Sequence, residues 1–204
     1  MFEVRGRLTR RRLLAAAAST SAALLAGGLA ACGRTGQGSG ASGAGASGEA
    51  ILARGNGPDP DSLDPQKART VEAQNILRDV FEGLTSVARD GGVAAGVATA
   101  WAASPDGRTY TFRLRPEARW SSGDPVVAAD FVAGLRRLVD PTTASPYAQV
   151  IEAISNAQEV VTGRKPPSAL GVSAPDDHTV VVALDAPTPY LPALLSHPST
   201  GPVH

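Results

Sequence analysis

The sequence is poor in the residues that most often carry chemistry, with one cysteine and three histidines among 204 positions. A single cysteine excludes both an internal disulfide framework and a cysteine-rich zinc site. The histidines, His178, His197 and His204, do not have the spacing of a metal site. H-E-x-x-H, G-x-S-x-G and Walker phosphate-binding motifs are also absent. We therefore expect no catalytic residues, no metal site and no cofactor.

The sequence also lacks an excess of charge of either sign, because 19 basic residues balance 19 acidic ones. The two signs are unevenly placed, since five arginines and one acid precede Cys32. From Cys32 onward 14 basic residues face 18 acidic ones, which makes this part mildly acidic. Phosphate binding needs a basic face, so we do not expect nucleic acid as a partner.

The first 31 residues read as an export signal. A basic stretch, 1–12, is followed by an uncharged, Ala- and Leu-rich segment, 13–31. Leu29-Ala30-Ala31-Cys32 then resembles the lipobox of bacterial lipoproteins, which places cleavage before Cys32 and a lipid on its thiol. Arg10 and Arg11 also resemble a twin-arginine signal, although an ordinary basic n-region is the alternative. A plain transmembrane helix is the alternative for 13–31, since its length approaches that of a membrane span.

Residues 32–49 read as a lipidated cysteine followed by a tether, because 33–48 is almost entirely Gly, Ser and Ala. Two matches to G-x-G-x-x-G in this stretch neither follow a strand nor open a patterned helix, so we reject nucleotide binding there. The remaining residues, 50–204, form the expected folded body.

The body alternates helical and strand patterns, which favours an α/β or α+β fold. Residues 109–115 alternate apolar and polar side chains and predict a half-buried strand. Thr70 is a candidate N-cap for the first helix. We expect strands at 50–54, 109–115 and 179–184, and helices at 71–83, 128–138 and 147–161.

Several short segments of the body carry a family resemblance. They are SLDP at 62–65, RDVFEGL at 78–84, YTFRLR at 110–115, ARWSSG at 118–123, DFV at 130–132, DPTTASPY at 140–147, DDHT at 176–179 and HPSTGPV at 197–203. In order and spacing they resemble the solute-binding proteins of oligopeptide ABC importers, and 144–147 and 197–199 resemble the oligopeptide branch.

The resemblance implies the N-terminal lobe of a bilobed α/β fold of the type II periplasmic-binding-protein-like class. It implies a monomer, held at the cell membrane by its lipid and facing outside or the periplasm, that delivers oligopeptides to the permease subunits of an ABC importer. The peptide would lie extended and pair with the protein backbone, which tolerates many sequences. Two other readings stay open: a relative that binds dipeptides or a metal chelate, and a surface sensor or adhesin without a transport role.

Carried over position by position, the resemblance places Arg69, Thr70, Val71, Tyr147 and His197 at the peptide cleft. Tyr147 has a core aromatic as its alternative, and His197 a structural turn. Arg69 stands where related proteins carry glutamate, a charge reversal that should disfavour basic groups nearby. Family members are also much longer than 204 residues. We therefore expect the chain to be their N-terminal part, and one lobe cannot close on a ligand.

Overall fold

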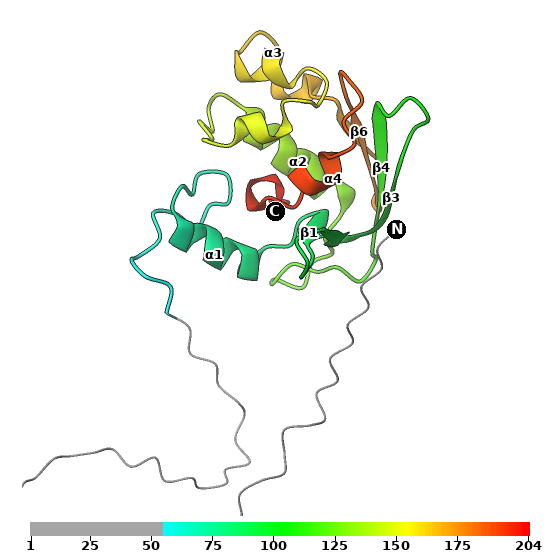
Figure 1. Ribbon diagram of the computed structural model, residues 1–204. Coiled ribbons are helices and arrows are strands. Elements are labelled where there is room, and N and C mark those ends of the chain that lie inside the picture. The colour runs from blue at the N-terminus through cyan, green and yellow to red at the C-terminus, as the bar shows by residue number, and fades with distance from the viewer. Residues whose placement is uncertain (1–54) are drawn as a thin grey trace, which may run out of the picture. The chain divides into compact units, whose positions relative to one another are not determined.

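The computed structural model describes residues 55–204 (Figure 1). The expected export signal with Arg10 and Arg11, the lipidated Cys32, the tether and the strand at 50–54 lie outside the described residues. None of the helices within 55–204 is long and apolar enough to cross a membrane.

The described body is built on two antiparallel sheets. The larger has four strands in the order β3-β4-β6-β5, where β3 is Ala98–Ala103, β4 is Thr109–Leu114, β5 is Val172–Asp176 and β6 is Thr179–Ala183. The smaller pairs β1 (Thr85–Val87) with β2 (Val93–Ala95). Every pairing between these strands is antiparallel, within the expected mixture of helix and sheet.

Strand β4 follows the predicted alternation. Tyr110, Phe112 and Leu114 are buried on one face, and Phe112 is fully buried. A tight turn at Pro105-Asp106-Gly107 joins β3 to β4, and Gly107 adopts φ +67, a backbone conformation that favours glycine. The apolar face of this central strand forms the middle of the core.

Helix α2 (Ala128–Val139) covers one face of the sheet, where it packs on β5 and β6 (Figure 1). The helical spacing of Phe131, Leu135 and Leu138 predicts that they form the inner face, and all three are fully buried. The Asp130 carboxylate begins the helix by accepting hydrogen bonds from the Val127 N–H at 2.9 Å and from the Trp120 indole at 3.0 Å. Both the position and the inner face of this helix are therefore confirmed.

Helix α1 (Val71–Val80) begins where predicted and ends three residues early. Thr70 Oγ1 accepts a hydrogen bond from the Ala73 N–H at 3.3 Å, which confirms the N-cap. The chain becomes extended at Phe81, so the expected continuation to residue 83 is wrong. The helical spacing of Ile76, Leu77, Val80, Phe81 and Leu84 predicts one inner face. Leu77 is buried as that predicts, whereas Val80 is 70% exposed, so its predicted place on the inner face is wrong.

The single helix expected at 147–161 is wrong. The segment contains a short 3-10 helix, η1 (Ala148–Ile151), and a short α-helix, α3 (Ala157–Val161). Between them Asn156 adopts φ +67, and Ile154 forms an isolated β-bridge with Leu184. The left-handed residue and the bridge interrupt the helix.

The described residues after α3 include several short helical elements. Another 3-10 helix, η2 (Pro167–Ala169), precedes β5, and α4 (Leu191–Leu194) and η3 (Pro198–Thr200) follow β6. Segment η3 contacts both α1 and α2, and Figure 1 shows the red end of the chain between them. The beginning and the end of the described body therefore pack against each other.

Candidate functional site

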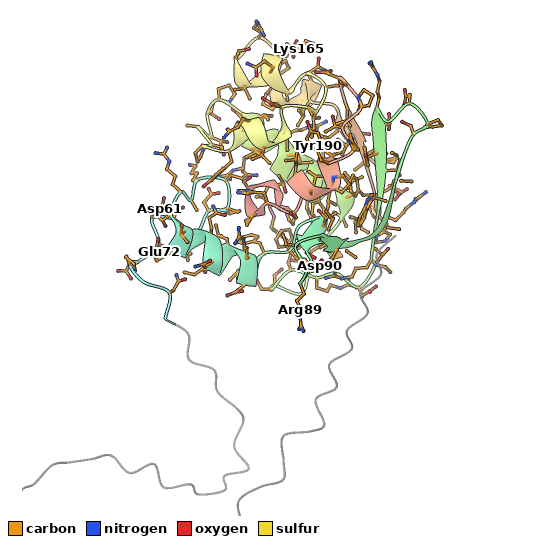
Figure 2. All side chains as sticks on the ribbon, viewed as in Figure 1. Asp61, Glu72, Arg89, Asp90, Lys165 and Tyr190 are labelled. Carbon is orange, nitrogen blue, oxygen red and sulfur yellow. The ribbon has the colours of Figure 1, made fainter. Side chains whose placement is uncertain are left out.

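The loop before α1 holds three of the predicted binding residues in a fixed conformation. Asp61 Oδ2 accepts a hydrogen bond from the Arg69 N–H at 2.9 Å. Asp61 Oδ1 accepts from the Thr70 N–H at 3.3 Å and the Thr70 hydroxyl at 3.0 Å. These bonds, led by the one from Arg69, lower the pKa of Asp61. Figure 2 shows Asp61 beside the start of α1, where Arg69, Thr70 and Val71 follow one another.

Two backbone groups of this loop are left available. Within residues 55–204 neither the Arg69 carbonyl nor the Val71 N–H makes a hydrogen bond. Val71 is the first residue of α1, whose opening N–H groups have no partner inside the helix. Val71 is 71% exposed, so this edge faces outward. The loop can therefore offer one acceptor and one donor to an extended chain.

The loop forms one wall of a concavity of about 530 Å³. Its lining consists of Asp61, Ser62, Lys67 and Arg69 on the loop, and Thr142, Thr143 and Ala144 on the turn after α2. Ala144 adopts φ +52, an uncommon conformation for a residue with a Cβ. Two segments far apart in the sequence thus enclose one small polar space.

Tyr147 and His197 lie side by side, which the sequence could not establish. Their ring centroids are 4.7 Å apart and their planes are tilted by 47°. His197 Nδ1 accepts a hydrogen bond from the Ser199 N–H at 3.2 Å, which begins η3. Burial, and then the positive charge of Arg78, lower the pKa of His197, which keeps the ring neutral and the nitrogen able to accept.

The predicted binding residues therefore form two groups. Arg69, Thr70 and Val71 belong to the loop before α1, and Tyr147 with His197 forms the ring pair. No hydrogen bond or ring contact among residues 55–204 joins the two groups directly.

An ion pair that was not predicted anchors the loop to α2. Both oxygens of Asp64 accept from the Arg137 guanidinium, at 3.0 and 2.6 Å. Gln66, which is fully buried, also contacts Arg137 and donates from Nε2 to the Gly134 carbonyl at 2.6 Å. The hydrogen bond from Arg137 lowers the pKa of Asp64. The loop is therefore held in place at both ends, by Asp61 and by Asp64.

A larger concavity lies elsewhere and contains none of the predicted binding residues. Its volume is about 720 Å³, and apolar, cationic and acidic side chains line it together, with Asp64 and Glu82 as the acids. The principal ones are Phe81, Val97, Trp120 and Val126, with Arg115, Arg119 and Arg137. We assign the candidate site to the smaller concavity, because Arg69, a predicted binding residue whose carbonyl is free, lines it together with Lys67.

No group of three or more potential metal ligands occurs within residues 55–204. His178 lies in the turn between β5 and β6, where its N–H donates to Asp176 Oδ1 at 2.8 Å. His204 lies 3.5 Å from Asp124, and both side chains are largely exposed. The described part of the chain therefore shows no constellation suited to hold a metal ion.

Comparisons with known proteins place the chain among extracellular binding proteins. It is 49% identical over 154 residues to the periplasmic oligopeptide-binding protein OppA of Escherichia coli (strain K12), covering 74% of this chain and 28% of that protein. It is 44% identical over 147 residues to the periplasmic murein peptide-binding protein MppA of the same organism, covering 71% and 27%. The chain thus spans a little over a quarter of these relatives.

The fold agrees with solved structures of such proteins. The crystal structure of Haemophilus influenzae OppA in complex with the peptide RPPGFSPFR matches with a TM-score of 0.71 at 44% identity, covering 73% of this chain and 29% of that one. This likeness confirms the periplasmic-binding-protein-like fold class that the sequence predicted. Residues 92–204, more than half of the chain, match the family described as bacterial extracellular solute-binding proteins, family 5 Middle. The chain belongs to the family 5 bacterial extracellular solute-binding proteins.

Proposed function

We propose that the chain is the N-terminal part of an extracytoplasmic protein that binds oligopeptides and delivers them to an ABC importer. The observation that carries this proposal is the pair of free backbone groups, the Arg69 carbonyl and the Val71 N–H, on a rigid exposed loop. An extended peptide can use both groups as an added strand would, and such pairing does not read side chains. The identity to oligopeptide-binding proteins supports the choice of ligand.

Tyr147 and His197 serve in this proposal as a rigid wall against which a peptide side chain packs. Their rings contact each other, and His197 is fixed by its bond to the Ser199 N–H. A wall of two held rings contributes contact area without losing much conformational freedom on binding.

Val71→Pro tests the peptide proposal sharply. Proline removes the Val71 N–H, yet the first helical position tolerates it, and Thr70 already has the extended backbone that a following proline requires. We expect the protein, as expressed from its gene, to bind mixed oligopeptides in calorimetric titrations. Losing one hydrogen bond should weaken this binding about threefold to tenfold.

Val71→Ala is the matched control, because it shortens the side chain and keeps the N–H. If the Pro and Ala variants bind peptides with equal affinity, the Val71 N–H does not contribute to peptide binding. The absence of any peptide binding by the unaltered protein would end the proposal.

We further propose that 1–31 is an export signal, that Cys32 carries the lipid and that 33–49 tethers the body to the membrane. The sequence Leu29-Ala30-Ala31-Cys32 and the Gly- and Ser-rich stretch behind it support this assignment. Stable anchoring takes more than one acyl chain, which a diacylglyceryl group supplies.

Cys32→Ala should move the protein from the membrane fraction to the soluble fraction of fractionated cells, because the thiol is the site of lipid attachment. Ala31→Ser, a small-for-small change beside the cleavage point, should stay with the membrane. A membrane-bound Cys32→Ala protein would instead favour a permanent span at 13–31.

A further inference from the structure

The concavity before α1 carries more positive than negative charge. Lys67 and Arg69 both line it, both are exposed, and neither side chain has a hydrogen bond or ion pair within residues 55–204. Asp61 is the one acid in its lining. Both oxygens of Asp61 accept hydrogen bonds from Arg69 and Thr70, and no ion pair joins that carboxylate to either cation within residues 55–204. With the charge of Asp61 counted, the lining still has two cations against one anion.

The opposite wall adds no acid that could neutralise these cations. It consists of Thr142, Thr143 and Ala144. Asp140, the nearest acid in sequence, accepts from the Thr142 N–H at 2.8 Å and from the Thr142 hydroxyl at 2.7 Å, and it does not line the concavity. The side chains of Lys67 and Arg69 therefore make no hydrogen bond or ion pair within residues 55–204, although the charge of Lys67 also helps to lower the pKa of Asp64. Across from them lies a turn that is held by Asp140.

We infer that this concavity is a subsite for a carboxylate group of the bound peptide, held by Lys67 and Arg69. The inference rests on the proposed function, since Arg69 supplies both the free backbone carbonyl and one of the two cations. A peptide paired with that carbonyl lies within reach of the guanidinium. Arginine suits this role because its planar fork matches both oxygens of a carboxylate, and lysine adds a compact second charge.

A volume of about 530 Å³ admits an acidic side chain or a peptide end with its water, and an open mouth allows exchange. The site therefore selects for acidic peptides over neutral ones and disfavours basic ones at this point. The carboxylate can come from a Glu or Asp side chain or from the peptide terminus, and the probes below separate these sources.

Nuclear magnetic resonance of the isotope-labelled protein tests the subsite directly. N-acetyl-glutamate amide is titrated beside its neutral isostere, N-acetyl-glutamine amide. We expect the acid alone to shift the amide signals of Arg69, Thr70 and Thr142, and added salt to weaken the effect. Acetyl-glycine, whose carboxylate is terminal, reports whether a peptide end is accepted as well.

Lys67→Gln and Arg69→Gln should each lower the apparent affinity for the acid about twofold to fivefold, the range for an exposed ionic contact. The matched control is Arg89→Gln, an exposed arginine in the β1–β2 turn that Figure 2 shows well away from Asp61. It should leave the titration unchanged. Thermal unfolding followed by circular dichroism confirms that all three variants keep the fold.

The outcomes separate the subsite from peptide binding as such. Peptides that bind without preference between Glu and Gln, in the unaltered protein and in both variants, overturn the subsite and leave the proposed function standing. An affinity for the carboxylate that falls in both Lys67→Gln and Arg69→Gln but not in Arg89→Gln upholds the subsite, even where no peptide binds and the proposed function fails. An affinity that stays unchanged in both variants overturns it.

Discussion

At the scale of single residues, two aspartates of the first loop have different partners and different roles. Asp61 accepts from backbone N–H groups and shapes the loop from within. Asp64 binds Arg137 of α2 with both oxygens and fastens the loop to the body. Asp61 therefore determines which backbone groups of the loop stay free, and Asp64 determines where the loop lies on the body.

Asp64→Asn should reduce stability at neutral pH and remove part of its acid dependence. The pKa of Asp64 is lowered from 3.8 in the folded chain, so its contribution is complete above that value. It is lost as the pH falls through the folded-state pKa, because protonation breaks the pair with Arg137. Both side chains are partly exposed, so we expect a loss of about 0.5–1 kcal/mol.

Urea unfolding of the unaltered protein and the variant between neutral and acid pH measures this difference. Asp59→Asn removes one negative charge from an exposed residue of the same loop and serves as the control. If the two variants lose equal stability, the cause is net charge and not the ion pair.

Single residues of the candidate site could be predicted from the sequence, but the residues that they contact could not. Arg69, Thr70, Val71, Tyr147 and His197 were named one by one, and their ligand contacts stay a prediction. The contact between Tyr147 and His197 depends on the tertiary fold. So does the pairing of Asp64 with Arg137, which lie 73 positions apart. The sequence pattern holds no signal for either.

At the scale of elements, periodic segments were predictable and irregular ones were not. Strand β4, strand β6 and helix α2 have strong apolar periodicity, and each was found within about two residues, the usual uncertainty of element ends. Strand β3 was missed because its sequence, ATAWAA, is mostly alanine, which has low strand propensity. Its pairing with β4 overrides that local preference.

The segment at 147–161 shows how tertiary contacts interrupt a helical pattern. Asn156 donates from Nδ2 to the Ala169 carbonyl at 2.7 Å while its backbone is left-handed. Asparagine tolerates this conformation better than most residues. Apolar spacing alone favoured a continuous helix, and it could not show that Ile154 pairs with Leu184.

Helix α2 contains a glycine at its closest approach to the end of the chain. A Cβ on Gly134 would lie 2.5 Å from the Gly201 carbonyl oxygen. Alanine gains about 1 kcal/mol of helix propensity over glycine, but overpacking against backbone costs about 1–3 kcal/mol. We therefore expect Gly134→Ala to destabilise the protein in urea unfolding despite its better helix propensity.

Ala133→Gly, at the exposed neighbouring position, isolates the propensity contribution and should cost about 1 kcal/mol. A Gly134→Ala protein stabilised by that same amount would show that α2 and the segment around Gly201 are not in tight contact.

At the scale of the whole described body, elements near residue 200 pack against elements near residue 85. The Thr85 hydroxyl of β1 donates to the Pro192 carbonyl of α4 at 2.6 Å, across 107 positions of the sequence. The Leu195 carbonyl lies against Gly83, and the Val203 N–H donates to the Asp130 carbonyl at 3.4 Å. These contacts tie the first hairpin and α2 to residues 192–203.

Thr85→Val should cost about 1–3 kcal/mol, because it leaves the Pro192 carbonyl buried without its partner. Ser86→Ala is the control, since its hydroxyl binds the Ala95 carbonyl near solvent and its loss should change little. Chemical denaturation of both variants gives the comparison. A neutral Thr85→Val would mean that apolar packing alone holds α4 to β1.

The long reach between Thr85 and Pro192 bears on how the protein is made. Ribosomes deliver a chain from its N-terminus, so β1 emerges 107 residues ahead of its partner. Until residues near 192 arrive, β1 lacks its contact with α4, and contacts of such long range form slowly. During that interval the nascent chain exposes apolar surface near β1 that is buried in the folded protein, and chaperones bind such surface.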